Sequence, residues 1–356
     1  MRVIQIIDSL DAGGAERIAV GYCNMLSEKI TFSGLVTTRR EGALKSQIAG
    51  AVNYLFLEKK SIFDFKSVFR LRTFVKNNKV AIIHAHGTSF FIAGLLKLVY
   101  PRVKIVWHEH YGARARQSIV ANSVLFFCSF LFHTVFVVNH ELEKWVKTKL
   151  PVKRVYFIPN FATLDNNSSQ TLLKGKKGMR IVCLANLKNP KNHIIVLQAF
   201  EHVLKKYPDY SLHFVGKDYD DAYSLGLKSF VYKNGLDRSV FFYGSKDDIS
   251  AILLQANIGV LASTEEGFPV TLLEYGLAKL AVVTTNVGHC SVIVTHNTSG
   301  LLFSPDNAVQ LEKELIRMIE NPDIANQFAQ HLHDEVLFRY SKENITEIIM
   351  SKYKQL

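Results

Sequence analysis

The chain has 356 residues, which fits two domains of ordinary size better than one. Hydrophobic residues make up 48% and charged residues 21%, a globular composition that excludes a disordered chain. The formal charge of +12 lies in residues 1–165, which hold 23 lysines and arginines against 11 aspartates and glutamates, whereas residues 166–356 hold 20 of each. This asymmetry indicates that the first half faces an anionic partner: nucleic acid, a membrane surface or a phosphorylated substrate.

Two further features indicate the cellular compartment of the protein. The scattered cysteines contain no C-x-x-C motif, so we expect no zinc site or disulfide framework and a reducing, cytoplasmic location. They are Cys23, Cys128, Cys183 and Cys290. The N-terminal apolar run is too short for a signal peptide. The longest apolar stretch, Ile119–Val138, is as long as a membrane span, but its polar interruptions and β-branched end predict a buried helix followed by a core strand.

Short apolar runs alternate with helical patterns through the first half. The expected strands are Val3–Ile7, Phe32–Thr37, Val52–Phe56, Val80–His84, Val103–Trp107, Thr134–Val138 and Val155–Ile158. A helix is predicted near Ala15–Leu26, after the first of them. Fully apolar strands that alternate with helices indicate a parallel sheet covered on both faces.

The alternation stops after residue 158 and then restarts. Residues 163–178 are rich in Asn, Ser, Gly and Lys and predict an interdomain linker. The later strands are Arg180–Ala185, Ser211–Val215, Val240–Tyr243, Ile258–Ala262 and Ala281–Thr285, with a helix at Asn192–Tyr207 and a helical tail after about Ala308. We therefore expect an α/β protein with two doubly wound, Rossmann-like domains facing each other across a ligand-binding cleft. Their expected bounds are 1–162 and 179–340, with a C-terminal helix, 341–356, packing back on the first domain.

A glycine pair, Gly13-Gly14, follows the first strand and opens the first helix. Paired glycines let the backbone approach a ligand, and a helix N-terminus favours an anion. The motif is neither G-x-G-x-x-G nor a P-loop, so the dinucleotide fingerprint and the P-loop are absent. A plain tight turn explains the spacing equally well.

The segment Glu265–Gly276 follows the strand at 258–262 and carries the most informative pattern. Pro269 suits the first turn of a helix, and Gly267 permits an unusual backbone angle before it. The free amides of the first turn, Val270 and Thr271, would then point at a phosphate.

Two carboxylates in this segment are expected to bind one ligand. Glu266 lies in the loop and Glu274 about one turn into the helix, and carboxylates accept hydrogen bonds from sugar and ribose hydroxyls. Glu265 fits a solvated acidic helix start instead.

Cations and small residues end the neighbouring strands. Lys188 and Lys191 stand just past the strand at 180–185, where a lysine can neutralise a diphosphate leaving group, although an exposed basic turn has the same pattern. Gly216-Lys217 and Gly244-Ser245 close two later strands, and we expect them to line the pocket for the base and the phosphates.

Together, these motifs resemble glycosyltransferase family 4, a family of retaining, metal-independent nucleotide-sugar transferases of the GT-B fold. The resemblance rests on Gly13–Arg17, Ile158–Asn160, Asn186–Lys191 and the Glu266…Glu274 pair, in that order over nearly the whole chain. Its specific part is E-x7-E with a Gly-Phe-Pro insert. It implies a hexosyltransferase that uses a nucleotide-diphosphate sugar, needs no metal or other cofactor, and acts on a glycan or lipid-linked acceptor in capsule, lipopolysaccharide or exopolysaccharide synthesis.

The resemblance also implies a role for each matching residue. Glu274 would hold the ribose, Glu266 would contact the donor sugar at the reacting centre, and Lys191 would bind the diphosphate. Backbone groups of Gly267, Phe268, Pro269, Val270 and Thr271 would bind the sugar and phosphates, and Gly13 and Gly14 would let the first domain close on the donor. Whether Glu266 is a nucleophile or only a stabiliser stays open.

Some positions fit the family less directly. His110 matches the family's active-site histidine better than His108. Asn186 stands where many members carry Arg, and Lys188 could supply that cation without the bidentate geometry of arginine. His84 and His86 end another strand, and a hydrogen-bonded structural pair is favoured over contact with the acceptor.

The charge asymmetry points to residues 58–76, where cations alternate with phenylalanines. Phe65, Val68, Phe69 and Val75 are expected on one helical face, and such a helix either lies on an anionic membrane or covers a sheet. Arg102, Lys104, Arg114 and Arg116 add charge. We hypothesise that the first domain docks peripherally on the cytoplasmic face of the membrane.

Three other classes remain open at this point. A GT-B-fold nucleotide-sugar epimerase would share the donor site, and a non-catalytic sugar-nucleotide or polyanion-binding module would bind the donor without turnover. A nucleic-acid-binding protein is suggested by charge alone. The sequence contains no zinc-finger or RNA-recognition signature, so we expect no nucleic-acid partner.

Overall fold

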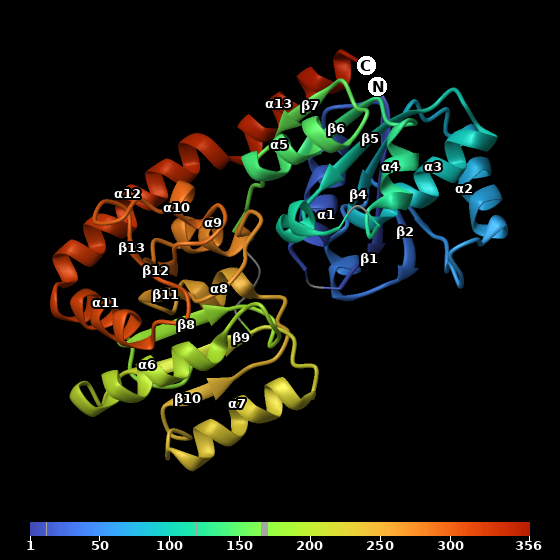
Figure 1. Cartoon of the computed structure of the whole chain (residues 1–356). Helices are drawn as coiled ribbons and strands as arrows, with labels where there is room; N and C mark the ends of the chain where they lie inside the picture. The colour runs from blue at the N-terminus through green and yellow to red at the C-terminus, as the bar shows by residue number, and fades with distance from the viewer. Residues whose placement is uncertain (12, 119, 165–169) are drawn as a thin grey trace. The chain divides into compact units, whose positions relative to one another are not determined.

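The computed structural model describes residues 1–11, 13–118, 120–164 and 170–356, which divide into two compact units (Figure 1). Unit 1 comprises Met1–Asn160 together with Lys342–Leu356, and unit 2 comprises Phe161–Ser341. The C-terminal segment thus belongs to the same unit as the N-terminus. Each unit is built around one parallel β-sheet with helices packed against it.

The described part of unit 1 contains a seven-stranded sheet in the order β3-β2-β1-β4-β5-β6-β7, in which every pair is parallel. The strands are β1 (Arg2–Ser9), β2 (Phe32–Arg40), β3 (Asn53–Phe56), β4 (Ile82–His86), β5 (Lys104–Glu109), β6 (Thr134–Val137) and β7 (Val155–Phe157). The strand order reverses between β1 and β4, which is where open α/β sheets bind ligands at their carboxyl ends.

Helices connect these strands, and side-chain caps fix where two of them begin. They are α1 (Gly14–Ser27), α2 (Phe65–Asn77), α3 (Phe90–Val99), α4 (Ser123–Ser129), α5 (His140–Lys149) and α13 (Lys342–Lys354), with short 3-10 turns at Ala43–Gln47, Gly87–Ser89 and Gly112–Arg116. Asp64 accepts from the amide of Ser67 at the start of α2, and Asn139 accepts from the amide of Leu142 at the start of α5. The chain returns to unit 1 through α13, which packs against α1 and buries Ile345, Ile349 and Tyr353.

One sequence prediction in unit 1 was wrong in part, and the structure adds detail to another. The stretch 119–138 does end in the buried strand β6, but α4 is not a buried helix, since Phe127 and Phe130 beside it are 71% and 64% exposed. In α2, Val68 and Val75 are buried, whereas Phe65 and Phe69 are exposed. The four residues adjoin on one side of the helix, and only the part that carries Val68 and Val75 is covered. Among the described helices, none is long and apolar enough to span a bilayer.

Unit 2, as far as it is described, contains a six-stranded parallel sheet in the order β10-β9-β8-β11-β12-β13. The strands are β8 (Arg180–Leu184), β9 (Ser211–Val215), β10 (Val240–Phe242), β11 (Ile258–Leu261), β12 (Ala281–Thr285) and β13 (Leu301–Phe303). Strand β13 was not predicted because three residues carry too little pattern. The helices are α6 (His193–Lys206), α7 (Ala222–Lys233), α8 (Ile249–Leu253), α9 (Val270–Leu277), α10 (Cys290–Ile293), α11 (Ala308–Glu320) and α12 (Pro322–Tyr340).

The core of unit 2 joins the strands to the helices beside them. Phe200 of α6, Phe214 of β9 and Phe303 of β13 are buried in one apolar cluster, and α11 packs beside α6 (Figure 1). The segment expected as a linker, 163–178, lies in unit 2, with residues 165–169 outside the described residues. Thr171 is buried there, and its amide donates to Asp248 at 2.7 Å. Residues 170–178 are therefore anchored on this unit.

Candidate functional site

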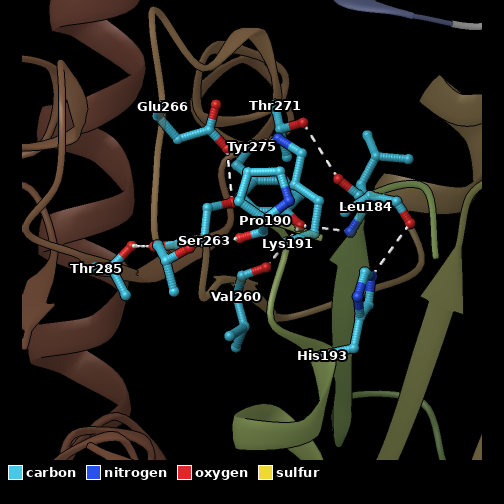
Figure 2. Close-up of polar contacts among 12 residues, drawn as sticks. Leu184, Pro190, Lys191, His193, Val260, Ser263, Glu266, Thr271, Tyr275 and Thr285 are labelled. Atoms are coloured by element: carbon cyan, nitrogen blue, oxygen red, sulfur yellow. Dashed lines mark hydrogen bonds and ion pairs between the residues drawn. The ribbon is translucent and has the colours of Figure 1, made fainter. Parts of the chain in front are cut away.

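Two predicted site residues meet at the carboxyl ends of the neighbouring strands β8 and β11. Lys191 Nζ donates to Glu266 Oε1 at 2.5 Å, and Ser263 Oγ donates to the same oxygen at 2.7 Å (Figure 2). The Glu266 side chain is 8% exposed and that of Lys191 25% exposed. Residues separated by 75 positions in sequence thus form a mostly buried ion pair that remains open to solvent on the lysine side.

The loops that carry this pair are tied together by their backbones. The amide of Thr264 donates to the carbonyl of Pro190 at 2.8 Å, and Thr285 Oγ1 donates to the carbonyl of Ser263 at 2.7 Å. Gly288 has φ +52°, and a Cβ at this position would lie 1.8 Å from the carbonyl oxygen of Glu266. Only glycine fits against the Glu266 backbone. Ser263 and Gly288 were not predicted as site residues, because neither forms a motif without its long-range neighbour.

Helix α9 is pinned to the same strand ends. Thr271 Oγ1 donates to the carbonyl of Leu184 at 3.2 Å, and the hydroxyl of Tyr275 accepts from the Leu184 amide at 2.7 Å (Figure 2). The helix begins at Val270, with Pro269 as its N-cap, one position earlier than a proline in the first turn. Because the first amides of a helix lack intrahelical acceptors, the Val270 and Thr271 end favours an anion.

The rest of the predicted E-x7-E segment divides between the core and the surface. Glu274 lies one turn into α9, as the spacing predicted, and is 6% exposed. The Phe268 ring is buried, stacked on His289 with centroids 4.9 Å apart and edge-on to Tyr340 at 5.5 Å. Its side chain is therefore a packing anchor, which leaves only its backbone for a donor. Glu265 is exposed.

The remaining predicted donor residues lie on the loops after β8, β9 and β10. Asn186 Oδ1 accepts from the amide of Lys217 at 2.9 Å, so this side chain joins two loops. Lys188 and Lys217 place their Nζ atoms 5.8 and 5.3 Å from the ring centroid of Tyr219, within cation–π range. Lys217 directly follows Gly216, and both were expected to line the pocket. Gly216 packs on Ala185, with 2.2 Å between its would-be Cβ and the Ala185 oxygen, and Ser245 is exposed.

In unit 1, the glycine pair begins α1. Gly13 is the N-cap, and a Cβ there would lie 2.2 Å from the Glu16 carboxylate, which also accepts from Ser9 Oγ at 3.3 Å. Around Gly14 the space is open to 4 Å. The φ of Gly13 is −122°, which any residue can adopt, and its would-be Cβ meets only the end of the flexible Glu16 side chain, so the turn does not require glycine there. Gly14 leaves room beside the helix start.

A buried cluster of polar side chains fills one side of the sheet at β1, β4 and β5. Register pairs Gln5 with His84 and His86 with His108, and alternation places His110 on the same side. His84 Nε2 and His108 Nδ1 are 3.2 Å apart, and His86 Nδ1 and His110 Nε2 are 2.9 Å apart. His84 and His86 are therefore both hydrogen-bonded inside unit 1.

Burial keeps these histidines neutral. It lowers the pKa of His84, His86 and His108 well below 6.5, with the neighbouring histidines adding to the effect. It lowers the pKa of His110 to about 3. The cluster can therefore donate and accept hydrogen bonds at neutral pH without carrying charge.

An ion pair lies next to His110. The Arg114 guanidinium pairs with the buried carboxylate of Glu109, and Arg114 Nη1 also donates to Asn122 at 3.2 Å. Burial raises the pKa of Glu109, while Arg114 opposes this shift. Arg116 pairs with Glu141 at 3.5 Å. The charge that Arg114 adds to unit 1 is therefore balanced by the Glu109 carboxylate.

Among the described residues, one group could place ligand atoms around a metal: ring nitrogens of His84, His86 and His108 lie within 4.8 Å of one another. However, the His84 and His86 rings are stacked, with centroids 4.5 Å and planes 18° apart. Nitrogen lone pairs lie in the ring plane, so those of stacked rings run side by side instead of converging on an ion. This geometry favours a hydrogen-bonded cluster.

The cysteines offer neither ligands nor nucleophiles near this cluster. All four are free. Burial raises the thiol pKa of Cys23, Cys183 and Cys290 to about 12, so these thiols stay protonated.

Two family profiles match the chain in succession. Residues 12–166 match the family described as Glycosyltransferase Family 4, and residues 165–332 match Glycosyl transferases group 1. The chain belongs to glycosyltransferase family 4, and it is a glycosyltransferase.

Among its relatives are an uncharacterized glycosyltransferase of Haemophilus influenzae (24% identity, 89% of this chain and 90% of the relative) and the O-antigen biosynthesis glycosyltransferase WbnH of Escherichia coli (23%, 83% and 84%). A capsular polysaccharide biosynthesis glycosyltransferase, CapH of Staphylococcus aureus, is 21% identical over 81% of this chain and 82% of its own.

Solved structures show the same fold. The Anabaena HepE complex with UDP and glucose matches with a TM-score of 0.85 at 16% identity, covering all of both chains. Sucrose-phosphate synthase from Thermosynechococcus elongatus matches with a TM-score of 0.84 at 16% identity, covering 100% of this chain and 99% of that one. The glycosyltransferase therefore has the GT-B fold, as the sequence predicted.

Proposed function

We propose that this glycosyltransferase moves a hexose, with retention of configuration, from a nucleotide-diphosphate sugar to a glycan or lipid-linked acceptor during synthesis of a cell-surface polysaccharide. The observation that carries the proposal is the Lys191–Glu266 pair beside the start of α9. Relatives named for O-antigen and capsule synthesis support the pathway, and the HepE complex with UDP and glucose supports the donor class.

The pair fits the charge changes of glycosyl transfer. The bond from the anomeric carbon to the diphosphate breaks, a bond to the acceptor oxygen forms, and the acceptor hydroxyl loses its proton. The diphosphate gains negative charge, which the Lys191 ammonium and the first amides of α9 would stabilise. When the phosphate competes for Lys191, the Glu266 carboxylate is released to face the positive charge at the anomeric carbon.

The other donor contacts follow from position on the same elements. Glu274, one turn along α9, would accept from the ribose hydroxyls. Lys188 and Lys217, which share the Tyr219 ring, offer further charge for the phosphates. Protein cations would supply the charge that a metal ion supplies in other transferases, so we expect full activity in the presence of a chelator.

A donor screen tests the proposed function. The protein is incubated with a panel of nucleotide sugars and a lipid extract, with and without a chelator, and nucleotide-diphosphate release is measured. The anomeric configuration of the product is then read by NMR, and retention is expected. Isomerised nucleotide sugar without transfer would identify an epimerase instead, and donor binding without turnover would identify a non-catalytic module.

Matched variants test the residues. Glu266→Gln and Lys191→Met should each lower turnover by about 10²–10³-fold, the usual effect of removing a group that stabilises transition-state charge. Glu265→Gln removes the adjacent exposed carboxylate and should leave turnover near that of the wild type. Thermal unfolding verifies that each variant is folded. Near-normal turnover of Glu266→Gln or Lys191→Met would refute the site.

We further propose that unit 1 docks on an anionic phospholipid surface at the cytoplasmic face of the membrane, where a lipid-linked acceptor would be presented. Large apolar side chains are exposed on α2, α3, α4 and the turns beside them, and these helices pack in that order (Figure 1). This aromatic face comprises Phe63, Phe65, Phe69, Leu98, Phe127 and Phe130. Unit 1 carries 26 lysines and arginines against 12 acidic residues, whereas unit 2 carries 17 against 19, so only unit 1 complements an anionic surface.

Vesicle sedimentation tests the membrane proposal. Phe65→Ser combined with Phe69→Ser should weaken binding to vesicles that contain phosphatidylglycerol, because both insertable rings of α2 are lost. The matched control, Leu225→Ser with Tyr232→Ser, changes two exposed apolar residues on α7 of unit 2. Equal binding by both double variants, or no binding of the wild type at low salt, would refute the proposal.

A further inference from the structure

The histidine cluster contains a hydrogen-bonded chain with a fixed direction. Gln5 Oε1 lies 2.8 Å from His86 Nε2, and His86 Nδ1 lies 2.9 Å from His110 Nε2. These three side chains come from β1, from β4 and from the residue that follows β5, strands that are neighbours in the sheet (Figure 1). All the contacts are within unit 1.

The direction follows from which atoms can donate. An amide oxygen only accepts, so His86 must carry its proton on Nε2. A neutral imidazole has one N–H, which leaves His86 Nδ1 as an acceptor. His110 must then donate from Nε2, and its own Nδ1 carries a free lone pair. Since burial keeps both rings neutral, the chain fixes one tautomer of each.

His110 Nδ1 is the end of this chain. The atom is buried, and among the described residues no group donates a hydrogen bond to it. A buried acceptor without a donor is unfavourable, so this position is matched to a ligand that brings an N–H or O–H group. A sugar hydroxyl has that chemistry, whereas a phosphate oxygen would be repelled by the lone pair.

We infer that Gln5 and His86 are positioning residues that hold His110 with Nε2 protonated, so that Nδ1 accepts a hydrogen bond from a sugar hydroxyl of the donor or the acceptor. The inference rests on the proposed function for its ligand, but the tautomer itself is a property of the protein alone. His86 acts only through His110. The parallel chain from Tyr353 through His84 to His108 lies beside it and stacks on the same rings.

NMR of the histidine side chains tests the tautomer directly. Long-range nitrogen–proton correlations distinguish a bare ring nitrogen from a protonated one, and a His110→Gln variant assigns the His110 signals. We expect a bare Nδ1 and a protonated Nε2 on His110 in the ligand-free wild type. Gln5→Leu removes the acceptor at the start of the hydrogen-bonded chain, so His110 should become a mixture of both tautomers. The control, Tyr22→Phe, also changes a buried residue stacked on these rings, and it should leave His110 in the single tautomer. A protonated Nδ1 on His110 in the wild type would overturn the inference.

Kinetics then test the consequence. His86→Leu removes the acceptor for His110 and should lower kcat/KM by about ten-fold to a hundred-fold, the range expected for a buried hydrogen bond that is lost. His86→Gln keeps one donor and one acceptor and should recover most of that loss, which a purely structural role of the imidazole would not explain. A rise in KM for the nucleotide sugar alone would assign the hydroxyl to the donor, and a rise for the acceptor alone would assign it to the acceptor.

The outcomes separate the two proposals. Equal kcat/KM for His86→Leu, His86→Gln and the wild type would overturn the positioning role. Inactivity of the wild type with every donor, together with the expected tautomer, would count against the proposed function and leave the positioning chain intact. Should His86→Leu fail to fold, Gln5→Leu provides the same comparison.

Discussion

The two units place their candidate residues at the same kind of position, the carboxyl ends of parallel strands, but with opposite electrostatics. Unit 1 uses His84, His86 and His108, which are buried and neutral. Unit 2 uses a charged pair, Lys191 and Glu266, whose lysine remains partly open to solvent. Neutral rings can orient a hydroxyl without attracting phosphate, whereas a lysine can stabilise a diphosphate. Under the proposed function, the two strand ends would recognise different parts of the reactants.

The net charges of the two units differ in the opposite direction from the charges at their strand ends. Unit 1, with neutral groups at its strand ends, has an excess of 14 positive charges, while unit 2 has an excess of two negative charges. Net charge therefore does not mark the predicted phosphate site. In unit 2, a few lysines positioned on strand-end loops replace a general positive field.

Lowering the pH should produce the largest difference between the two units. The pKa of histidine is about 6.5 in the unfolded chain and lower in these folded sites. Between these two pKa values the unfolded state binds more protons, so the folded state loses stability as the pH falls. Among the described residues, unit 1 has five such histidines, at positions 84, 86, 108, 110 and 133, and the pKa of His110 is about 3. Unit 2 has two, His193 and His213, with pKa values of about 4. Each histidine should cost up to about 2 kcal/mol at about pH 5.

Hydrogen exchange measured by mass spectrometry at about pH 7 and about pH 5 reports the opening of each unit separately. Unit 1 should lose protection first and more steeply. Earlier loss in unit 2 would contradict the neutral assignment of the cluster.

Glycine substitution should separate steric fit from backbone conformation. Gly288 in unit 2 and Gly87 in unit 1 both have φ +52°. Ala at either position carries the left-handed penalty of about 1–2 kcal/mol. At Gly288 the new Cβ would also meet the Glu266 carbonyl at 1.8 Å, whereas at Gly87 the space is open to 4 Å. Gly288→Ala should therefore lower the free energy of unfolding, measured in urea, by clearly more than Gly87→Ala. Equal losses would show that the Glu266 loop can move aside.

The ion pair in unit 2 should show measurable coupling. In a double-mutant cycle of Lys191→Met and Glu266→Gln, each single change leaves a partner mostly buried, while the double change removes both charges. We expect a coupling free energy of about 1 kcal/mol, within the usual range for residues in contact. Urea unfolding of the four proteins measures it. Additive losses would show that the contact is not maintained in the free enzyme.

Capping should give the smallest effect and the same one in both units. Asp64 caps α2 in unit 1, and Asp221 caps α7 in unit 2, each through a side-chain oxygen that accepts a backbone N–H at 3.0 Å. Replacing either with Ala should cost about 1 kcal/mol. Thermal unfolding of both variants checks this. A much larger loss for one of them would show that the units differ in stability as well as in chemistry.

Local pattern determined much of this protein. Apolar strands alternating with helices specified two parallel sheets, because a strand buried on both faces is mostly apolar and lacks the polar alternation of a strand with one exposed face. The Glu266…Glu274 spacing placed one carboxylate in a loop and the other one turn into α9, since 3.6 residues per turn fixes that offset. Both patterns involve residues that are close in sequence, so they can be recognised without knowing how the rest of the chain folds.

Tertiary structure decided what depends on strand order and register. Strand pairing joined Gln5, His86 and His110 into a directed chain, and it brought Lys191 to Glu266 across 75 positions. It also buried Val68 of α2 while leaving Phe65 exposed, although both are apolar and lie on one helix. Periodicity shows that a helix has an apolar side, but the sheet it meets determines which part of that side is covered. Long-range pairing has no local signature, because it depends on where distant segments lie once the chain has folded.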